Sequence, residues 1–147
     1  KGLCYLELGK ESEAISIFHK ATVGSSEPAQ AFFYNDQQPD KIFYQGLAWR
    51  ALGDEKKARS RFNKLIKHGE KHLFDNCKID YFAVSLPDLA IWEEDLNKRN
   101  LLHCNYVMGL GHLGLGNLVK ARSFLEEVRK LDVNHQGGQI HLNMCNK

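Results

Sequence analysis

Apolar residues recur along this chain with the spacing of α-helices, and three stretches share one pattern. Each has a Gly, an aromatic residue or His three positions on, and a second Gly four positions later; an Ala, a large apolar residue and a small or apolar residue follow at intervals of five, four and three. Because such a unit cannot bury its apolar face alone, the pattern predicts a stack of helical hairpins. The copies are Gly2-Tyr5-Gly9-Ala14-Phe18-Ala21, Gly46-Trp49-Gly53-Ala58-Phe62-Leu65 and Gly109-His112-Gly116-Ala121-Leu125-Val128.

The small residues of each copy have different predicted roles. The first Gly is expected where the two helices of a hairpin approach closely, because a Cβ there would hold them apart. The second Gly is expected to end the first helix as a left-handed C-terminal cap. The Ala is expected where the second helix crosses the first. In that order, the residues are Gly2, Gly46 and Gly109; Gly9, Gly53 and Gly116; and Ala14, Ala58 and Ala121.

Helical periodicity and capping residues predict the other elements. Ser26 can cap a helix that has Pro28 in its first turn, and Asp40 can cap the next one. Residues 78–82 also alternate like a strand, so periodicity leaves that stretch open between helix and strand. The predicted helices cover residues 1–8, 11–23, 29–34, 41–52, 55–68, 71–76, 78–85, from 92 or 94 to 115, 118–131 and 135–144.

The repeated pattern resembles the tetratricopeptide repeat (TPR), a helix-turn-helix unit of about 34 residues with Gly, Tyr, Ala and Phe at set places. The resemblance implies an all-α fold, a TPR-like right-handed superhelix of antiparallel helical hairpins. The closing Pro of the family is missing from all three copies, and Val133 stands at its place in the third. The copies start 44 and 63 residues apart. This wide spacing predicts helical inserts between the hairpins.

The predicted organisation is a single TPR-like domain over residues 1–147. The chain opens inside a predicted helix, so we interpret it as a fragment of a longer protein. The expected parts are a truncated repeat 1 at 1–24, repeat 2 at 40–68, an irregular insert at 69–100, repeat 3 at 101–133, and a capping or partial repeat helix at 134–147.

The charge balance narrows the classes of partner. The formal net charge is +2, whereas a nucleic-acid-binding protein usually has a basic excess on one face, so no nucleic-acid partner is expected. No run of about 18 apolar residues is present, which predicts no membrane span. The longest basic run is interpreted as the solvated face of a helix whose buried side carries Phe62, Leu65 and Ile66. It comprises Lys56, Lys57, Arg59, Arg61, Lys64, Lys67 and Lys71.

Cysteines and histidines suggest packing rather than chemistry. The cysteines stand far apart without a C-x-x-C pair, which favours buried thiols over disulfides and a reducing cytoplasm, although the localisation stays unknown. His68 and His72, followed by Cys77, have the spacing of helical metal ligands, as do His141 and Cys145. Neither set reaches four ligands, so we expect surface or partly buried imidazoles and no metal. The four cysteines are Cys4, Cys77, Cys104 and Cys145.

The chain has no G-x-S-x-G, H-E-x-x-H or P-loop motif, so neither an enzyme nor a cofactor is expected. Residues 109–114 spell G-x-G-x-x-G, but they lie inside a helical repeat rather than after a strand, and we interpret them as helix packing. Capping of helix starts explains the one acidic cluster at least as well as acid–base chemistry does. That cluster comprises Asp80, Asp88, Glu93, Glu94 and Asp95.

The TPR resemblance also implies a concave groove, lined by the first helix of each hairpin, in which repeats of this family hold a peptide. Eight residues would face it: Asp40, Phe43, Leu47, Arg50, His103, Tyr106, Leu110 and Leu113. Some members clamp a C-terminal carboxylate with Lys and Asn. Here Phe43 and Tyr106 stand where Lys would be expected, and Leu47 and Leu110 where Asn would, so such a ligand is disfavoured. The insert at 69–100 could itself fill the groove, and this alternative stays open.

Residues 44–48, 78–89 and 108–114 look like the C-terminal TPR region of large bacterial multidomain proteins, whose N-terminal part resembles a carbohydrate-acting or carbohydrate-binding module. Two functions follow. The first is a non-catalytic protein–protein interaction or intramolecular docking scaffold, with a protein, a peptide or the upstream domains of the same polypeptide as partner. The alternative is an accessory domain of a carbohydrate-active bacterial enzyme that contributes to sugar binding. Solvent-exposed rings would favour the sugar-binding alternative, because sugars stack on exposed aromatic rings. The candidate rings are those of Trp49, Tyr81, Trp92 and Tyr106.

Overall fold

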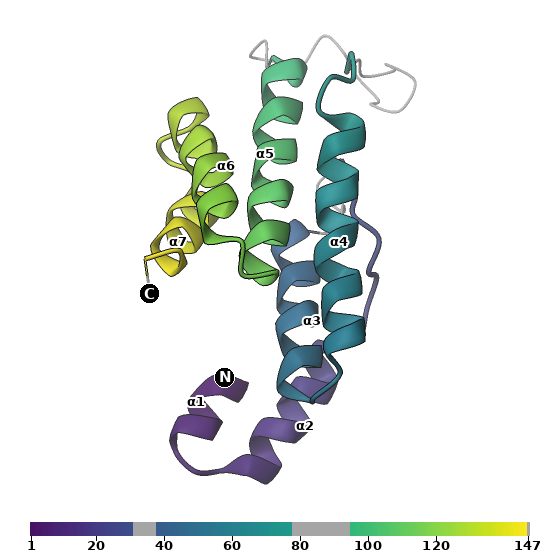
Figure 1. The fold of residues 1–147 in the computed structure, drawn as a ribbon, viewed down its shortest axis with the longest axis vertical. Coiled ribbons are helices and arrows are strands. Elements are labelled where there is room, and N and C mark those ends of the chain that lie inside the picture. The colour runs from purple at the N-terminus through teal and green to yellow at the C-terminus, as the bar shows by residue number, and fades with distance from the viewer. Residues whose placement is uncertain (31–37, 78–94, 147) are drawn as a thin grey trace, which may run out of the picture.

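A computed structural model of the chain describes residues 1–30, 38–77 and 95–146. These residues form helices and no strand, as the all-α prediction requires. The helices pair into hairpins α1–α2, α3–α4 and α5–α6, and α7 packs on α6 and α5 (Figure 1). They are α1 (Gly2–Glu7), α2 (Glu11–Ala21), α3 (Pro39–Ala51), α4 (Glu55–His72), α5 (Leu96–Gly114), α6 (Leu118–Leu131) and α7 (Gln136–Met144).

The apolar core runs through the second and third hairpins and reaches α7. Helix α4 runs alongside both α3 and α5, so the two hairpins share one cluster of buried side chains (Figure 1). The α1–α2 hairpin joins the lower end of α3 through a smaller cluster of Ala14, Phe18 and Ala48. The three alanines of the repeated pattern, Ala14, Ala58 and Ala121, are fully buried.

The turn inside each hairpin depends on a glycine in the left-handed region. Gly9, Gly53 and Gly116 have φ angles of 70°, 82° and 81°, a conformation that costs other residues free energy. The next helix then begins within two residues. At the second turn, Asp54 caps α4 by accepting a hydrogen bond from the Lys57 amide. The predicted C-terminal caps are therefore confirmed at all three turns.

Close contact between helices explains the first Gly of each copy. A Cβ on Gly2 would lie 2.6 Å from Phe18 Cε1, and one on Gly109 would lie 2.8 Å from Leu125 Cγ. A Cβ on Gly46 would overlap the Phe62 ring in the same way. In each copy, the large residue of the second helix thus fills the notch left by the first Gly.

The G-x-G-x-x-G run at 109–114 is a packing motif, as interpreted. Gly109 faces α6, whereas a Cβ on Gly111 would lie 2.7 Å from the Phe62 carbonyl oxygen of α4. Gly114 faces the Phe62 ring. From the opposite side, a Cβ on Gly69 of α4 would lie 2.8 Å from the Cys104 carbonyl oxygen. The backbones of α4 and α5 therefore approach closely at two points, near Gly69 and near Gly111.

Some predicted helix ends were wrong. Helix α4 continues to His72 instead of ending near residue 68, because Gly69 packs against α5 rather than breaking the helix. A separate helix over 71–76 is consequently absent, since residues 75–77 have no regular structure. The start of α5 is Leu96, two residues after the later of the two predicted starts, because Asp95 is its N-cap.

Two predicted caps were also wrong. Helix α3 begins at Pro39 with Gln38 as the N-cap, because Pro suits the first position of a helix, so Asp40 lies in the first turn. Ser26 caps no helix, since residues 23–30 have no regular structure. The helix expected at 78–85 and its strand alternative lie outside the described residues, as does most of the helix expected at 29–34.

Residues 23–30 run alongside the second and third hairpins and are held by side chains of α3, α4 and α5. Gln45 Nε2 donates hydrogen bonds to the carbonyl oxygens of Val23 (3.3 Å) and Ser25 (3.0 Å). His103 Nε2 lies 2.8 Å from the Ala29 carbonyl oxygen and donates to it. In addition, Lys64 forms an ion pair with Glu27.

Gly109 and Gly111 of α5 permit a matched test of the packing. Gly111→Ala is expected to lower the free energy of unfolding by about 1–3 kcal/mol, because the new methyl group meets the Phe62 backbone. Gly109→Ala should cost less, since the atoms in its way belong to the Leu125 side chain. Both variants gain the same helix propensity of about 1 kcal/mol. Urea unfolding measures both, and a larger loss for Gly109→Ala would contradict this account.

Candidate functional site

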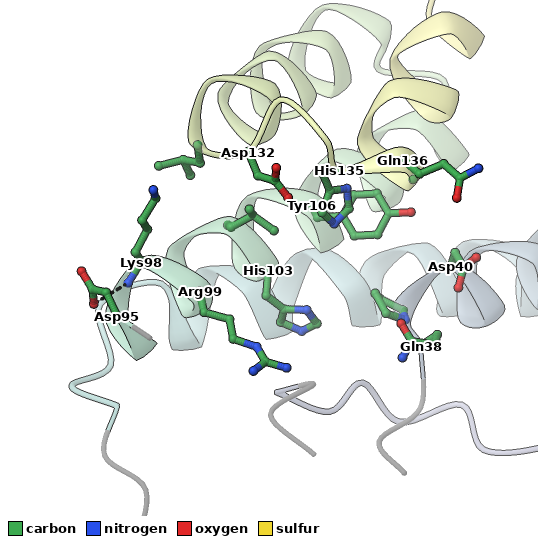
Figure 2. Close-up of a pocket in the computed structure, with 14 residues that line it drawn as sticks. Gln38, Asp40, Asp95, Lys98, Arg99, His103, Tyr106, Asp132, His135 and Gln136 are labelled. Carbon is green, nitrogen blue, oxygen red and sulfur yellow. Dashed lines mark hydrogen bonds between the residues drawn. The ribbon is translucent and has the colours of Figure 1, made fainter. Parts of the chain in front are cut away.

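A cavity of about 990 Å³ lies between the start of α3, one face of α5 and the turn from α6 to α7 (Figure 2). The first helices of the second and third hairpins, α3 and α5, thus both line this cavity. The residues that line it are Gln38, Pro39, Asp40, Asp95, Lys98, Arg99, Leu102, His103, Tyr106, Leu131, Asp132, His135, Gln136 and Gly137.

One wall of the cavity is a pair of rings from α5 and the start of α7. The Tyr106 and His135 rings meet edge to face, with 4.7 Å between their centroids. Behind them, Tyr106 Oη lies 3.1 Å from His141 Nδ1, which is 2.6 Å from the Gly137 carbonyl oxygen. Because a carbonyl oxygen only accepts, the proton of the neutral His141 ring is on Nδ1, which donates a hydrogen bond to the Gly137 carbonyl oxygen. This network fixes the ring wall against α7.

The network keeps its titratable groups neutral. Burial raises the pKa of the Tyr106 phenol, and the charge of Asp40 adds to the effect. Burial also lowers the pKa of His141, although the hydrogen bond to Gly137 and the charge of Asp40 oppose the shift. Both groups are therefore uncharged at neutral pH. This suits their buried position, because burial disfavours the charged form of a side chain.

Charged side chains of opposite sign occupy the two ends of the cavity. Lys98 and Arg99 lie at one end, near the start of α5, whereas Asp40 lies at the other end (Figure 2). Asp132 projects from the α6–α7 turn toward the ring pair (Figure 2). Asp95 is engaged as the N-cap of α5, with its Oδ1 accepting from the amides of residues 97 and 98. The cavity thus offers charges of both signs around an aromatic centre.

Three of the eight predicted groove residues line this cavity: Asp40, His103 and Tyr106. Leu47 and Leu113 are half-buried and pack against the core.

Three others lie away from the cavity. Arg50 is exposed and pairs with Glu55, with 2.9 Å between Nε and Oε2. Phe43 and Leu110, with 1% and 0% of their surface exposed, are core residues, which corrects their predicted place in the groove. Both belong to the core cluster that the second and third hairpins share, and at Phe43 helix α7 contributes, because the His141 ring lies against the Phe43 ring with centroids 5.3 Å apart.

The lining residues that were not predicted include Lys98, Arg99, Asp132 and His135. The first two share the helical face of His103 and Tyr106 in α5, so helical spacing within the predicted helix could have indicated them. The last two belong to the turn between α6 and α7, whose path the repeat pattern does not specify. Of the acidic cluster, Asp95 is confirmed as a cap, and the other members lie outside the described residues.

Of the aromatic rings proposed for sugar binding, the two that the structure describes are covered by other parts of the chain. Tyr106 is buried, and Lys57 Nζ lies over the half-buried Trp49 ring at 4.1 Å from its centroid. Tyr81 and Trp92 lie outside the described residues. Trp49 and Tyr106 therefore give no support to a surface on which sugar rings could stack.

A cluster of three imidazoles lies where α4 meets α5. The His68 ring is 4.7 Å from that of His72 and 5.9 Å from that of His103, between centroids. His72 Nδ1 is 2.6 Å from Asp75 Oδ2. Within residues 1–30, 38–77 and 95–146, no three His, Cys, Asp or Glu side chains are arranged to hold a metal ion. Burial, with the charges of His103 and His72, lowers the pKa of His68 to about 4.

All four cysteines are free thiols. Cys104 and Cys145 are buried as expected, whereas Cys77 is half-buried and Cys4 is exposed. Burial raises the pKa of Cys104 to about 12, so this thiol stays protonated.

The hairpin stack defines the class of the protein as a helical-repeat protein. Within this class, residues 42–68, in the second hairpin, match the family model described as Tetratricopeptide repeat, and the fold is TPR-like. Repeats of this family generally mediate protein–protein interactions and are generally not catalytic. No solved structure matches the chain. In the part of the chain that the structure describes, no helix combines the length and the apolar character needed to cross a bilayer.

The lowered pKa of His68 predicts a loss of stability in acid. The unfolded chain takes up a proton near pH 6.5, whereas folded His68 does so only near pH 4. Its contribution, on the order of 2 kcal/mol, is thus complete above about pH 6.5 and is lost as the pH falls through about 4. Urea unfolding between these values should be less pH-dependent for His68→Gln than for the wild type. His19→Gln, at an exposed site, is the control and should follow the wild type.

Proposed function

We propose that this protein is a non-catalytic interaction scaffold that holds a segment of a protein partner in the cavity between α3, α5 and the α6–α7 turn. The observation that carries the proposal is the cavity itself, which Asp40, His103 and Tyr106 line from consecutive first helices of the repeat. The partner is a separate protein or another part of the same polypeptide, in which case the interaction is intramolecular docking.

The chemistry of the lining suits a peptide. Leu102, Leu131 and the Tyr106 ring provide apolar surface, and the polar groups lie at the two ends. Pockets of this kind bury apolar groups of a ligand and orient it with a few polar contacts. With Lys98 and Arg99 at one end and Asp40 at the other, a segment with charges of both signs would bind in one direction.

The 23–30 segment supports this proposal, because it shows that the same helices can hold an extended polypeptide. Gln45 and His103 donate to its carbonyl oxygens. His103 also lines the cavity, so one residue of the proposed site already binds main chain. Recognition of backbone carbonyls together with side-chain pockets is a common way to bind extended peptides.

Selection from a random peptide library displayed on phage tests the proposal. Peptides enriched on the wild-type chain should bind Lys98→Glu at least about tenfold more weakly in fluorescence anisotropy, because the substitution reverses the charge at one end of the cavity. Lys67→Glu changes the charge equally on the exposed face of α4 and should bind like the wild type. If the selected peptides bind both variants equally, the cavity is not the site.

A further inference from the structure

Helix α7 begins with an unusual cap. His135 is its N-cap residue, and the ring Nδ1 accepts a hydrogen bond of 2.8 Å from the Gly138 amide. Residues that commonly cap helices, such as Asn, Ser and Asp, accept through oxygen atoms. A histidine can accept only through a ring nitrogen without a proton, so this cap requires the neutral imidazole with its proton on Nε2.

Protonation of His135 acts against α7 in two ways. It places a hydrogen on Nδ1, so the Gly138 amide loses its acceptor. It also places a positive charge at the N-terminus of the helix, where the helix dipole favours negative charge. The caps of α4 and α5 differ, because Asp54 and Asp95 accept through carboxylate oxygens. Among these three capped helices, α7 alone depends on a group that becomes positively charged when it is protonated.

The capped turn is part of the cavity wall. The His135 ring contacts Tyr106, and Gln136 and Gly137 line the cavity beside it. Space at this turn is small, because a Cβ on Gly137 would overlap Tyr106 Oη and one on Gly138 would lie 2.8 Å from Val128 Cγ1. If the first turn of α7 loosens, the ring pair and this side of the cavity lose their support.

The groups around His135 set the direction of its titration. Tyr106 faces it from α5, Asp132 from the preceding turn and His141 from α7, while Asp40 of α3 acts on Tyr106 and His141. Burial lowers the pKa of His135 below 6.5, and the charge of Asp132 opposes this shift. The ring is therefore neutral at physiological pH and gains its proton only below the ordinary pKa of histidine.

We propose that His135 makes the cavity pH-sensitive: the neutral ring caps α7 and holds the wall in place, and protonation removes the cap and loosens the wall. The regulation of partner binding that follows from this rests on the proposed function, whereas the structural change itself does not. A partner held in the cavity at neutral pH would then be released when His135 is protonated.

Amide hydrogen exchange observed by NMR tests the structural change without any partner. As the pH is lowered from about 7.5 until the imidazole shifts of His135 report its protonation, the protection of the Gly138 amide, corrected for intrinsic exchange, should fall by about 3- to 30-fold, the range expected for the loss of an N-cap. The Tyr106 ring resonances should shift with the same midpoint. The imidazole nitrogen shifts of His135 should show Nδ1 without a proton at neutral pH.

Two variants complete the test. His135→Asn retains a capping oxygen that does not titrate, so Gly138 protection and the Tyr106 shifts should no longer change over this pH range. His135→Ala lacks any cap, so the protection should be low at every pH. Circular dichroism confirms that each variant is folded. The proposal is overturned if His135→Asn keeps the wild-type pH dependence or if Nδ1 of the wild type carries the proton at neutral pH.

Failure of this test and failure of the proposed function are distinguishable. The exchange experiment uses the chain alone, so a failed peptide selection would leave its result intact. Conversely, a Gly138 amide that is equally protected before and after His135 gains its proton would exclude the switch and leave the proposed peptide site in the cavity untouched.

Discussion

The fit of Phe62 between three glycines is the contact on which the rest of the structure depends. Its ring fills the notch at Gly46 of α3 and also lies against Gly114 of α5, while its carbonyl group lies against Gly111. The side chain is fully buried and contacts the Phe43 ring, with centroids 6.0 Å apart. A single residue of α4 therefore sets how closely both neighbouring helices approach. Close-packed interiors tolerate little change in volume at such points.

This packing also positions the candidate site. With α3 and α5 both fixed against α4, Asp40 at the start of one helix and His103 and Tyr106 on the other come to the same cavity. The turn after α6 closes the cavity, and the Tyr106, His141 and Gly137 network attaches α7 to it. The shape of the cavity is thus a consequence of helix contacts made elsewhere. Of α7, only the first residues line the cavity.

Local signals in the sequence predicted most of the fold. Left-handed turns and close helix contacts both require glycine, so the repeated spacing indicated hairpins, and the run at 109–114 was correctly assigned to packing. Gly69 misled the prediction because the same residue type also ends helices. Part of the site could not be predicted, since the approach of α7 buries Phe43 and brings His135 to Tyr106. Such contacts between distant segments leave no periodic signal in either one.

The way the 23–30 segment is held has a consequence for sequence change. Gln45 and His103 donate hydrogen bonds to its carbonyl oxygens, which every amino acid possesses. These bonds place no demand on the side chains of Val23 and Ala29. Other positions are constrained, because Lys64 contacts Ser26 and Glu27, Gln30 contacts Asp75, and Gly24 has a φ angle of 108°. New side chains at Val23 or Ala29 would therefore be displayed on a main chain whose attachment does not depend on them.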